Sequence, residues 1–123
     1  MEASTSKSIL SSVVATTTSE AIEVGNAEKI TLTFTASAIS TGNGVFTVTG
    51  SIDGTNYVAL NTLIDNVTNT NAQNLTRVSS CTLSSNISKI YAIDLEKFGY
   101  KFIKVTATRT TDGAYSCSCL LEY

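Results

Sequence analysis

The fold is decided by the stretch Ile30-Thr31-Leu32-Thr33-Phe34-Thr35-Ala36, in which apolar residues alternate with threonines. Because successive side chains of a β-strand point to opposite faces, the alternation puts the apolar residues on one face and the three threonines on the other. Threonine also favours the extended conformation. The stretch therefore predicts a strand with one buried face and one face in solvent.

The same alternation recurs on both sides of this stretch, in segments short enough to be single strands. Phe46, Val48 and Ile52 share one face of a second segment, and Ile103, Val105 and Ala107 share one face of another. Together these patterns predict strands over residues 9–16, 21–24, 30–36, 45–52, 57–60, 63–67, 91–95, 101–109 and 114–123. Residues 61–76 are otherwise a long loop, and residues 94–99 are at most one helical turn.

Turn signals separate these segments. Asp53-Gly54-Thr55-Asn56 stands between residues 45–52 and 57–60, and Thr111-Asp112-Gly113 stands between residues 101–109 and 114–123. Asp-Gly is a strong short-range signal for a hairpin, because Gly adopts positive φ and Asp bonds its own backbone. Each copy therefore predicts a β-hairpin, and turn geometry accounts for both aspartates without a catalytic role. For the first turn, Ca²⁺ held by Asp53 with Asn56 stays open as the alternative.

About eight short strands with one apolar face each must pair those faces. The sequence predicts an all-β, antiparallel β-sandwich of jelly-roll or immunoglobulin-like type, and a closed β-barrel is the alternative. We expect one domain over residues 9–123, preceded by a polar, flexible N-terminal arm over residues 1–8.

Composition removes several classes of function. The 123 residues include no His and no Trp, so Ser–His and Cys–His nucleophiles and imidazole metal sites are excluded. The net charge of −2 gives no basic face for nucleic acid. Residues 1–8 contain no signal peptide or anchor, which predicts synthesis in the cytoplasm and no membrane partner. We expect no enzyme activity, no catalytic, cofactor or metal residues, no cofactor and no small-molecule substrate.

Three cysteines are an odd number and cannot all pair within one chain. Cys117-Ser118-Cys119 has a spacing unlike the C-x-x-C of zinc and redox sites, and a strand would place both sulfurs on one face with Tyr115 and Leu121. We expect Cys117, Cys119 and Cys81 to be buried, reduced thiols in the core. A disulfide from Cys81 to one of the others stays open.

The segment Ile9-Leu10-Ser11-Ser12-Val13-Val14 carries apolar residues in adjacent pairs. Its strand therefore has apolar side chains on both faces, and both faces are expected to be buried against other residues. A terminal strand of this kind can add to the sheet edge of a partner. Ile9, Leu10, Val13 and Val14 are therefore candidate partner-binding residues, with an ordinary edge strand as the alternative.

Two stretches resemble a known class of protein. Phe46-Thr-Val-Thr-Gly-Ser-Ile-Asp-Gly-Thr-Asn-Tyr-Val-Ala-Leu60 resembles the hairpin of β-sandwich modules in tailed-phage structural proteins. Tyr100-Lys-Phe-Ile-Lys-Val-Thr-Ala-Thr-Arg-Thr-Thr-Asp-Gly-Ala114 resembles their closing hairpin. The resemblance implies a non-enzymatic virion protein, such as a head decoration (auxiliary capsid) protein. It would form a homo-oligomer, a trimer, and bind the major capsid protein on the outer capsid surface to stabilise the lattice.

Discoidin-like and carbohydrate-binding sandwiches share the first hairpin, so a second function stays open. The chain could be a carbohydrate- or host-surface-binding module of a phage tail or fibre. That function needs exposed aromatic side chains, and the tyrosines available for it are Tyr57, Tyr91, Tyr100, Tyr115 and Tyr123. Tyr57 stands where the hairpin pattern often has Trp, which makes a stacking platform there weaker.

Overall fold

The computed structural model describes residues 4–65, 76–93 and 100–123, and all regular elements in this part of the chain are β-strands. They are β1 (Ser4–Val13), β2 (Thr17–Thr18), β3 (Ile22–Glu23), β4 (Lys29–Ser37), β5 (Asn43–Ser51), β6 (Val58–Ala59), β7 (Leu63–Asp65), β8 (Arg77–Val78), β9 (Ser80–Leu83), β10 (Ser88–Ile93), β11 (Phe102–Thr110) and β12 (Ala114–Glu122).

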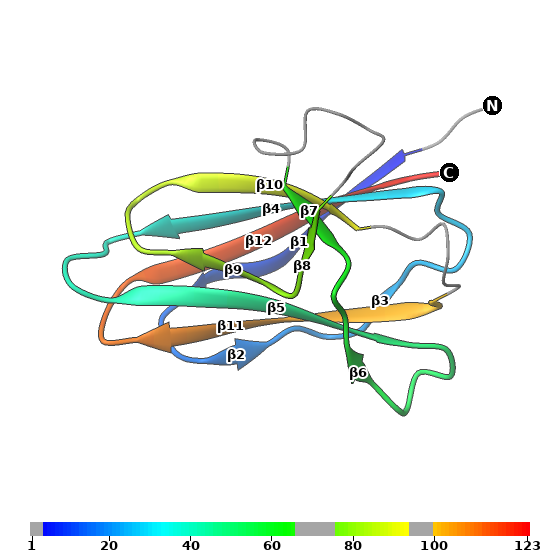
Figure 1. Cartoon of the computed structure of the whole chain (residues 1–123), viewed down its shortest axis with the longest axis horizontal. Coiled ribbons are helices and arrows are strands. Elements are labelled where there is room, and N and C mark those ends of the chain that lie inside the picture. The colour runs from blue at the N-terminus through cyan, green and yellow to red at the C-terminus, as the bar shows by residue number, and fades with distance from the viewer. Residues whose placement is uncertain (1–3, 66–75, 94–99) are drawn as a thin grey trace.

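The strands form two antiparallel sheets that pack face to face (Figure 1). One sheet has the order β1-β12-β4-β10-β7-β8, and we call it sheet A. The other, sheet B, has the order β2-β11-β5-β6, with β3 also beside β11 and β9 also beside β5. Neither sheet closes on itself within the described residues. The predicted β-sandwich is therefore confirmed, and the alternative of a closed barrel is wrong.

The core follows the alternation that the sequence shows. In β4, Ile30, Leu32 and Phe34 are buried, whereas the threonines between them are partly exposed. Phe34 of sheet A stacks on Phe46 of sheet B with ring centroids 4.5 Å apart, and Tyr115 meets Phe46 edge-on at 6.1 Å. Aromatic side chains thus fill the space between the sheets, and burial of apolar area holds the sheets together.

The Asp53-Gly54 hairpin is confirmed, because β5 pairs with β6 directly across that turn. The hairpin predicted at Thr111-Asp112-Gly113 is wrong. β11 belongs to sheet B and β12 to sheet A, so the chain crosses from one sheet to the other at this turn. Gly113 still supplies the positive φ, 104°, that the turn needs.

Other connections make the same crossing at the same end of the sandwich. Residues 38–42 lead from β4 to β5, residues 84–87 lead from β9 to β10, and residues 14–16 lead from β1 to β2. Figure 1 shows these links gathered at the left, where β4, β5 and β11 also begin or end. We call the loops 38–42, 84–87 and 111–113 together the crossing end. The opposite end carries the start of β11 and the finish of β12.

Some predicted boundaries differ from the structure. Residues 4–8 of the predicted N-terminal arm belong to β1 and pair with residues 118–122 of β12, while residues 1–3 lie outside the described residues. The strand predicted at 63–67 exists as β7, and residues 66–67 and the helical turn at 94–99 lie outside the described part. Eight of the strands have three or more residues, and β2, β3, β6 and β8 have two.

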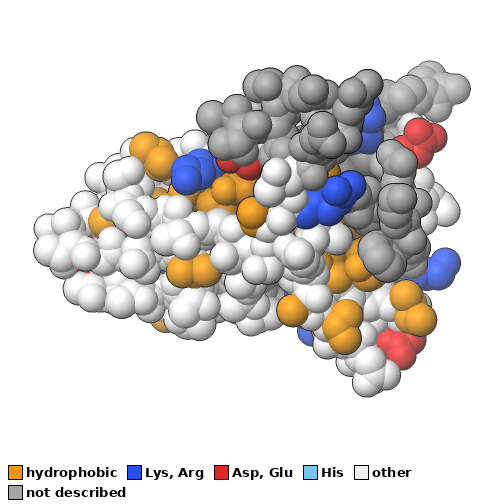
Figure 2. Space-filling model, viewed as in Figure 1, with side chains coloured by type: hydrophobic (Ala, Val, Ile, Leu, Met, Phe, Trp, Pro, Cys, Tyr) orange, Lys and Arg blue, Asp and Glu red, His pale blue; other side chains and the backbone are white. Residues whose placement is uncertain are grey.

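The outer surface is rich in hydroxyl groups and poor in charge. On β4, Thr31, Thr33 and Thr35 face outward, and Thr47 and Thr49 do so on β5. Figure 2 shows one face that is mostly uncharged, with hydrophobic side chains gathered at the lower right around the β5–β6 hairpin. Ile52 and Val58 of that hairpin are 72% and 62% exposed.

Candidate functional site

No three residues of the metal-binding types His, Cys, Asp and Glu come together within residues 4–65, 76–93 and 100–123. None of the described segments is a helix long and apolar enough to span a bilayer. Within these residues, the features that could form a site are individual carboxylates, thiols, sheet edges and surface depressions.

The carboxylate of Asp53 accepts hydrogen bonds from residues of the turn in which it lies. Its Oδ1 accepts hydrogen bonds from the backbone N–H of Thr55 and Asn56 and from the Ser51 hydroxyl, at 2.8 to 2.9 Å. Its Oδ2 accepts from the Asn56 side-chain amide at 3.0 Å. The bond from the Asn56 backbone, followed by the others, lowers the pKa of Asp53 far below its ordinary value. Because Asn56 turns its NH₂ group to the carboxylate, the contacts between these two side chains stabilise the hairpin turn.

Asp112 joins two of the loops at the crossing end. Its Oδ2 accepts from the backbone N–H of Ser40 and Thr41 at 3.1 Å, and its Oδ1 accepts from that of Gly42 at 2.9 Å. The Thr41 bond is the largest cause that lowers the pKa of Asp112, although desolvation opposes it. Asn86 joins the loop 84–87 to the loop 38–42, because its side-chain oxygen accepts a hydrogen bond from the Ile39 N–H at 2.8 Å. These carboxylate and amide groups hold the crossing end together.

The cysteines lie in the core, as predicted. Cys81, Cys117 and Cys119 are all buried and unbonded to one another. Burial raises the pKa of each thiol, and for Cys117 the neighbouring Cys119 adds to the effect. A thiol that stays protonated is a poor nucleophile and metal ligand, so these side chains pack as small apolar groups.

The structure divides the four candidate partner-binding residues. Leu10 is buried in the chain's own core, whereas Ile9 and Val13 are half-buried against it. Val14 follows β1 and is 62% exposed. The apolar pairs of this segment therefore mostly serve the internal core, and their role toward a partner stays a prediction.

What β1 offers instead is an open edge. It is the outermost strand of sheet A, and no described residue pairs with its outer side. Residues 4–8 pair in regular register with β12, whereas the register shifts after Ser8 and again after Leu10, and Ser12 takes a positive φ of 48°. The regular part of the open edge is thus Ser4–Ser8, which the sequence placed in a flexible arm.

The five tyrosines are not equivalent. Tyr115 and Tyr91 are buried at 0% and 6% exposure. Tyr57 and Tyr100 are half-buried, and the Lys104 ammonium lies 4.5 Å from the centre of the Tyr57 ring. Tyr123 is 42% exposed. An aromatic surface for stacking therefore exists at Tyr123, and the other four rings are wholly or partly withdrawn.

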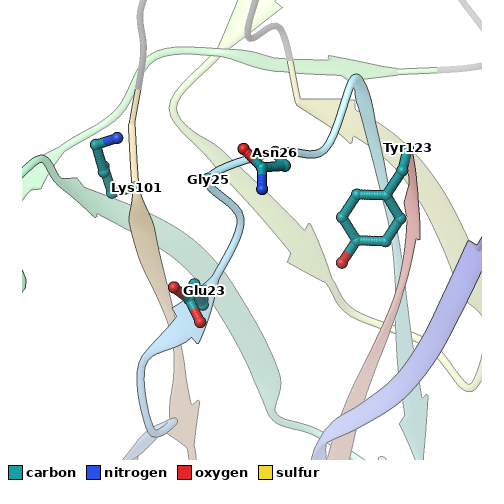
Figure 3. A pocket seen from close by; sticks show the side chains of 5 residues that line it. All are labelled: Glu23, Gly25, Asn26, Lys101 and Tyr123. Atoms are coloured by element: carbon teal, nitrogen blue, oxygen red, sulfur yellow. The ribbon is translucent and has the colours of Figure 1, made fainter.

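Tyr123 borders a surface depression of about 380 Å³ at the end of the sandwich opposite the crossing end. Figure 3 shows its lining, with the Tyr123 ring on one side, Glu23 and Lys101 on the other, and Asn26 between them. Gly25 completes the lining. Sequence reasoning named Tyr123 only as one of five tyrosines, because the other lining residues come from distant parts of the chain.

No protein-family model matches the sequence, and no curated protein matches it. The fold does match solved structures. The crystal structure of the SPBc2 prophage-derived protein YomS matches 100% of this chain and 96% of YomS, with a TM-score of 0.72 and 15% sequence identity. The PBSX exported protein XepA matches 99% of this chain with a TM-score of 0.73 and 12% identity.

The match covers 38% of XepA, so XepA contains much that this chain lacks. At these identities the likeness shows the fold alone.

Proposed function

We propose that the chain is a non-enzymatic structural protein of a tailed-phage virion, and more narrowly a decoration protein that binds the outer surface of the capsid. The observation that carries the proposal is the shared fold and size: the match to a prophage-derived protein extends over this whole chain and 96% of YomS. The major capsid protein is the proposed partner, and the capsid surface is the proposed location.

The described surface supports contacts of this kind. Its outer sheet faces carry threonine and serine hydroxyls with few charges, and each hydroxyl both donates and accepts hydrogen bonds. Such faces make many weak polar contacts without a deep pocket. When the contacts repeat over a lattice, the summed avidity is large even though each one is weak.

The open edge of β1 is the proposed site at which the capsid protein binds. The other sheet edges consist of strands of two to four residues, namely β8, β2 with β3, and β6 with β9, and short edge strands discourage strand addition. β1 has ten residues, and Ser4–Ser8 are paired in regular register on one side only. An extended segment of the capsid protein would add here through main-chain hydrogen bonds.

The direct test is cosedimentation with shells assembled from the major capsid protein encoded in the same genome. We expect saturable binding at a fixed ratio to the capsid lattice, and light scattering of the free protein at about three times the 13.0 kDa of one chain. A protein that stays in the supernatant at every concentration up to saturation of the assay would overturn the proposal. If light scattering shows only a monomer, the trimeric state proposed here is wrong.

The edge is tested separately with added charge. Ser6→Lys together with Ser8→Lys places two exposed ammonium groups on β1, which should block strand addition while leaving the core intact. Thr82→Lys together with Thr108→Lys is the matched control, because both residues are exposed on the outer face of sheet B. Loss of capsid binding only in the β1 variant supports the edge, and equal binding by both variants contradicts it.

A further inference from the structure

We propose that the depression bordered by Tyr123 binds a neutral sugar unit of a glycan, a property beyond the proposed capsid function. The site consists of Glu23, Gly25, Asn26, Lys101 and Tyr123, which lie around a space of about 380 Å³ (Figure 3). The size is at the lower end for ligand sites and fits one or two sugar rings.

The loop that forms one wall is held by both sheets. The Ala27 N–H donates to the Val24 carbonyl at 2.9 Å, which closes a tight turn with Gly25 and Asn26 at its tip. The Val24 N–H donates to the Lys101 carbonyl at 2.8 Å, and the Glu28 N–H donates to the Glu122 carbonyl at 2.7 Å. Asn26 is therefore carried by a preorganised turn, which lowers the entropic cost of binding.

The polar side chains of the depression keep their hydrogen-bonding capacity. Glu23, Asn26 and Lys101 make no side-chain hydrogen bond or ion pair with any residue in the described part of the chain. A carboxylate accepts, an ammonium group donates, and an amide does both. Neighbouring hydroxyls of a sugar, each of which donates and accepts, match this set, and unlike a simple anion they use all three groups.

The aromatic ring completes the chemistry. The Tyr123 ring is 42% exposed and stands across the depression from Glu23 and Lys101 in Figure 3. The C–H face of a pyranose packs against an aromatic ring while its hydroxyls point sideways to polar groups. Because one carboxylate and one ammonium group offset each other, the site favours an uncharged sugar over an acidic one.

Tyr123 also borders a second, smaller depression of about 150 Å³. It is lined by Glu28, Lys29, Glu122 and Tyr123. Tyr123 thus borders both spaces, and a neighbouring sugar unit of the same chain would occupy the second one. The site therefore fits an oligosaccharide better than a free monosaccharide.

The test is an NMR titration of the ¹⁵N-labelled full chain with glucose, galactose, mannose, rhamnose and N-acetylglucosamine, followed by an array of bacterial surface glycans. We expect shifts at the Gly25 and Asn26 amides at millimolar sugar and tighter binding of an oligosaccharide that contains the preferred unit. Tyr123→Ala should weaken binding about tenfold, whereas Tyr123→Phe should keep it within about threefold.

Ile52→Ala is the control, because Ile52 is an exposed apolar side chain of the β5–β6 hairpin and does not line the depression. Binding that is unchanged in Tyr123→Ala, or no shifts at Gly25 and Asn26 with any probe, would overturn the inference. Capsid cosedimentation of Tyr123→Ala should stay normal, so failure of the sugar site is distinguishable from failure of the capsid proposal.

Discussion

The hydroxyl of Tyr115 donates a hydrogen bond of 2.9 Å to the backbone carbonyl of Asp112, three residues earlier in the chain. The Tyr115 ring is fully buried between the sheets, and Asp112 sits in the loop that crosses between them. One side chain thus fills the core and fixes the crossing end. Burial of the ring and the nearby Asp112 charge raise the pKa of the phenol, which keeps it protonated as a donor.

Tyr115→Phe should lower the free energy of unfolding by about 1 kcal/mol, because it removes one hydrogen bond and leaves the ring in place. Urea unfolding followed by circular dichroism measures the change, which should appear as a lower midpoint with an unchanged slope. A variant as stable as the parent would show that water replaces the hydroxyl at the Asp112 carbonyl.

Gly44→Ala should be destabilising by about 1 to 3 kcal/mol, because the new methyl group overlaps the Tyr115 ring. A Cβ at Gly44 would lie 2.5 Å from Cδ1 and 2.7 Å from Cζ of that ring. Gly25→Ala is the control, since a Cβ there meets no atom within 4 Å. We expect Gly25→Ala to change the unfolding free energy by less than about 0.5 kcal/mol, and equal effects of the two variants would contradict the packing described.

Asp112 should make stability depend on pH in the acid range. Its pKa is lowered in the folded chain from the ordinary value of 3.8, so near and below that value the unfolded chain binds more protons. The stabilisation is therefore complete above pH 3.8 and is lost as the pH falls through the folded pKa.

Asp112→Asn tests this, because its NH₂ group cannot accept the bonds from Ser40 and Thr41. The variant should melt at a lower temperature at neutral pH and lose less stability on acidification than the parent. Glu20→Gln, which changes an exposed carboxylate elsewhere, is the control. If acid destabilises Asp112→Asn and the parent by the same amount, the carboxylate does not hold the loops.

The thiols should be unreactive until the chain unfolds. All three cysteines are buried with raised pKa values, so the native protein should react with a disulfide reagent only as fast as it opens. Ser118→Cys provides a matched exposed thiol, because Ser118 lies between Cys117 and Cys119 on the opposite face of β12. It should react at once, and equally fast labelling of the parent would disprove the burial of the three thiols.

The local sequence pattern predicted most of the long strands. In β4 and β11, for example, apolar residues alternate with polar ones, and this alternation directly indicates a strand with one buried face. It failed at Asp112-Gly113. A turn signal shows that the chain reverses. Which sheet the next strand joins depends on partners far away in the sequence, and for β12 these are β1 and β4. Residues 4–8 were missed for a related reason, since their polar side chains give no apolar face and their pairing comes from β12.

The candidate sugar site could not be predicted as a site. Its residues stand at positions 23, 25, 26, 101 and 123. They meet because the turn after β3 forms hydrogen bonds with a residue just before β11 and with one at the end of β12. Residues that meet through such long-range contacts form no motif of recognisable spacing in the sequence. The one available signal was the presence of a tyrosine. The sequence does not show which of the five tyrosines is exposed, and in the structure the other four are buried or half-buried.

The pairing of β1 with β12 ties the first described strand to the last. During synthesis from the N-terminus, Ser4–Val13 has no partner in sheet A until residues 114–122 have left the ribosome, and β4 also lacks one of its two neighbours. Sheet A therefore cannot be completed until β12 has been synthesised and has left the ribosome. A ribosome that stops short of β12 would release a product with β1 and β4 uncovered, ready to aggregate.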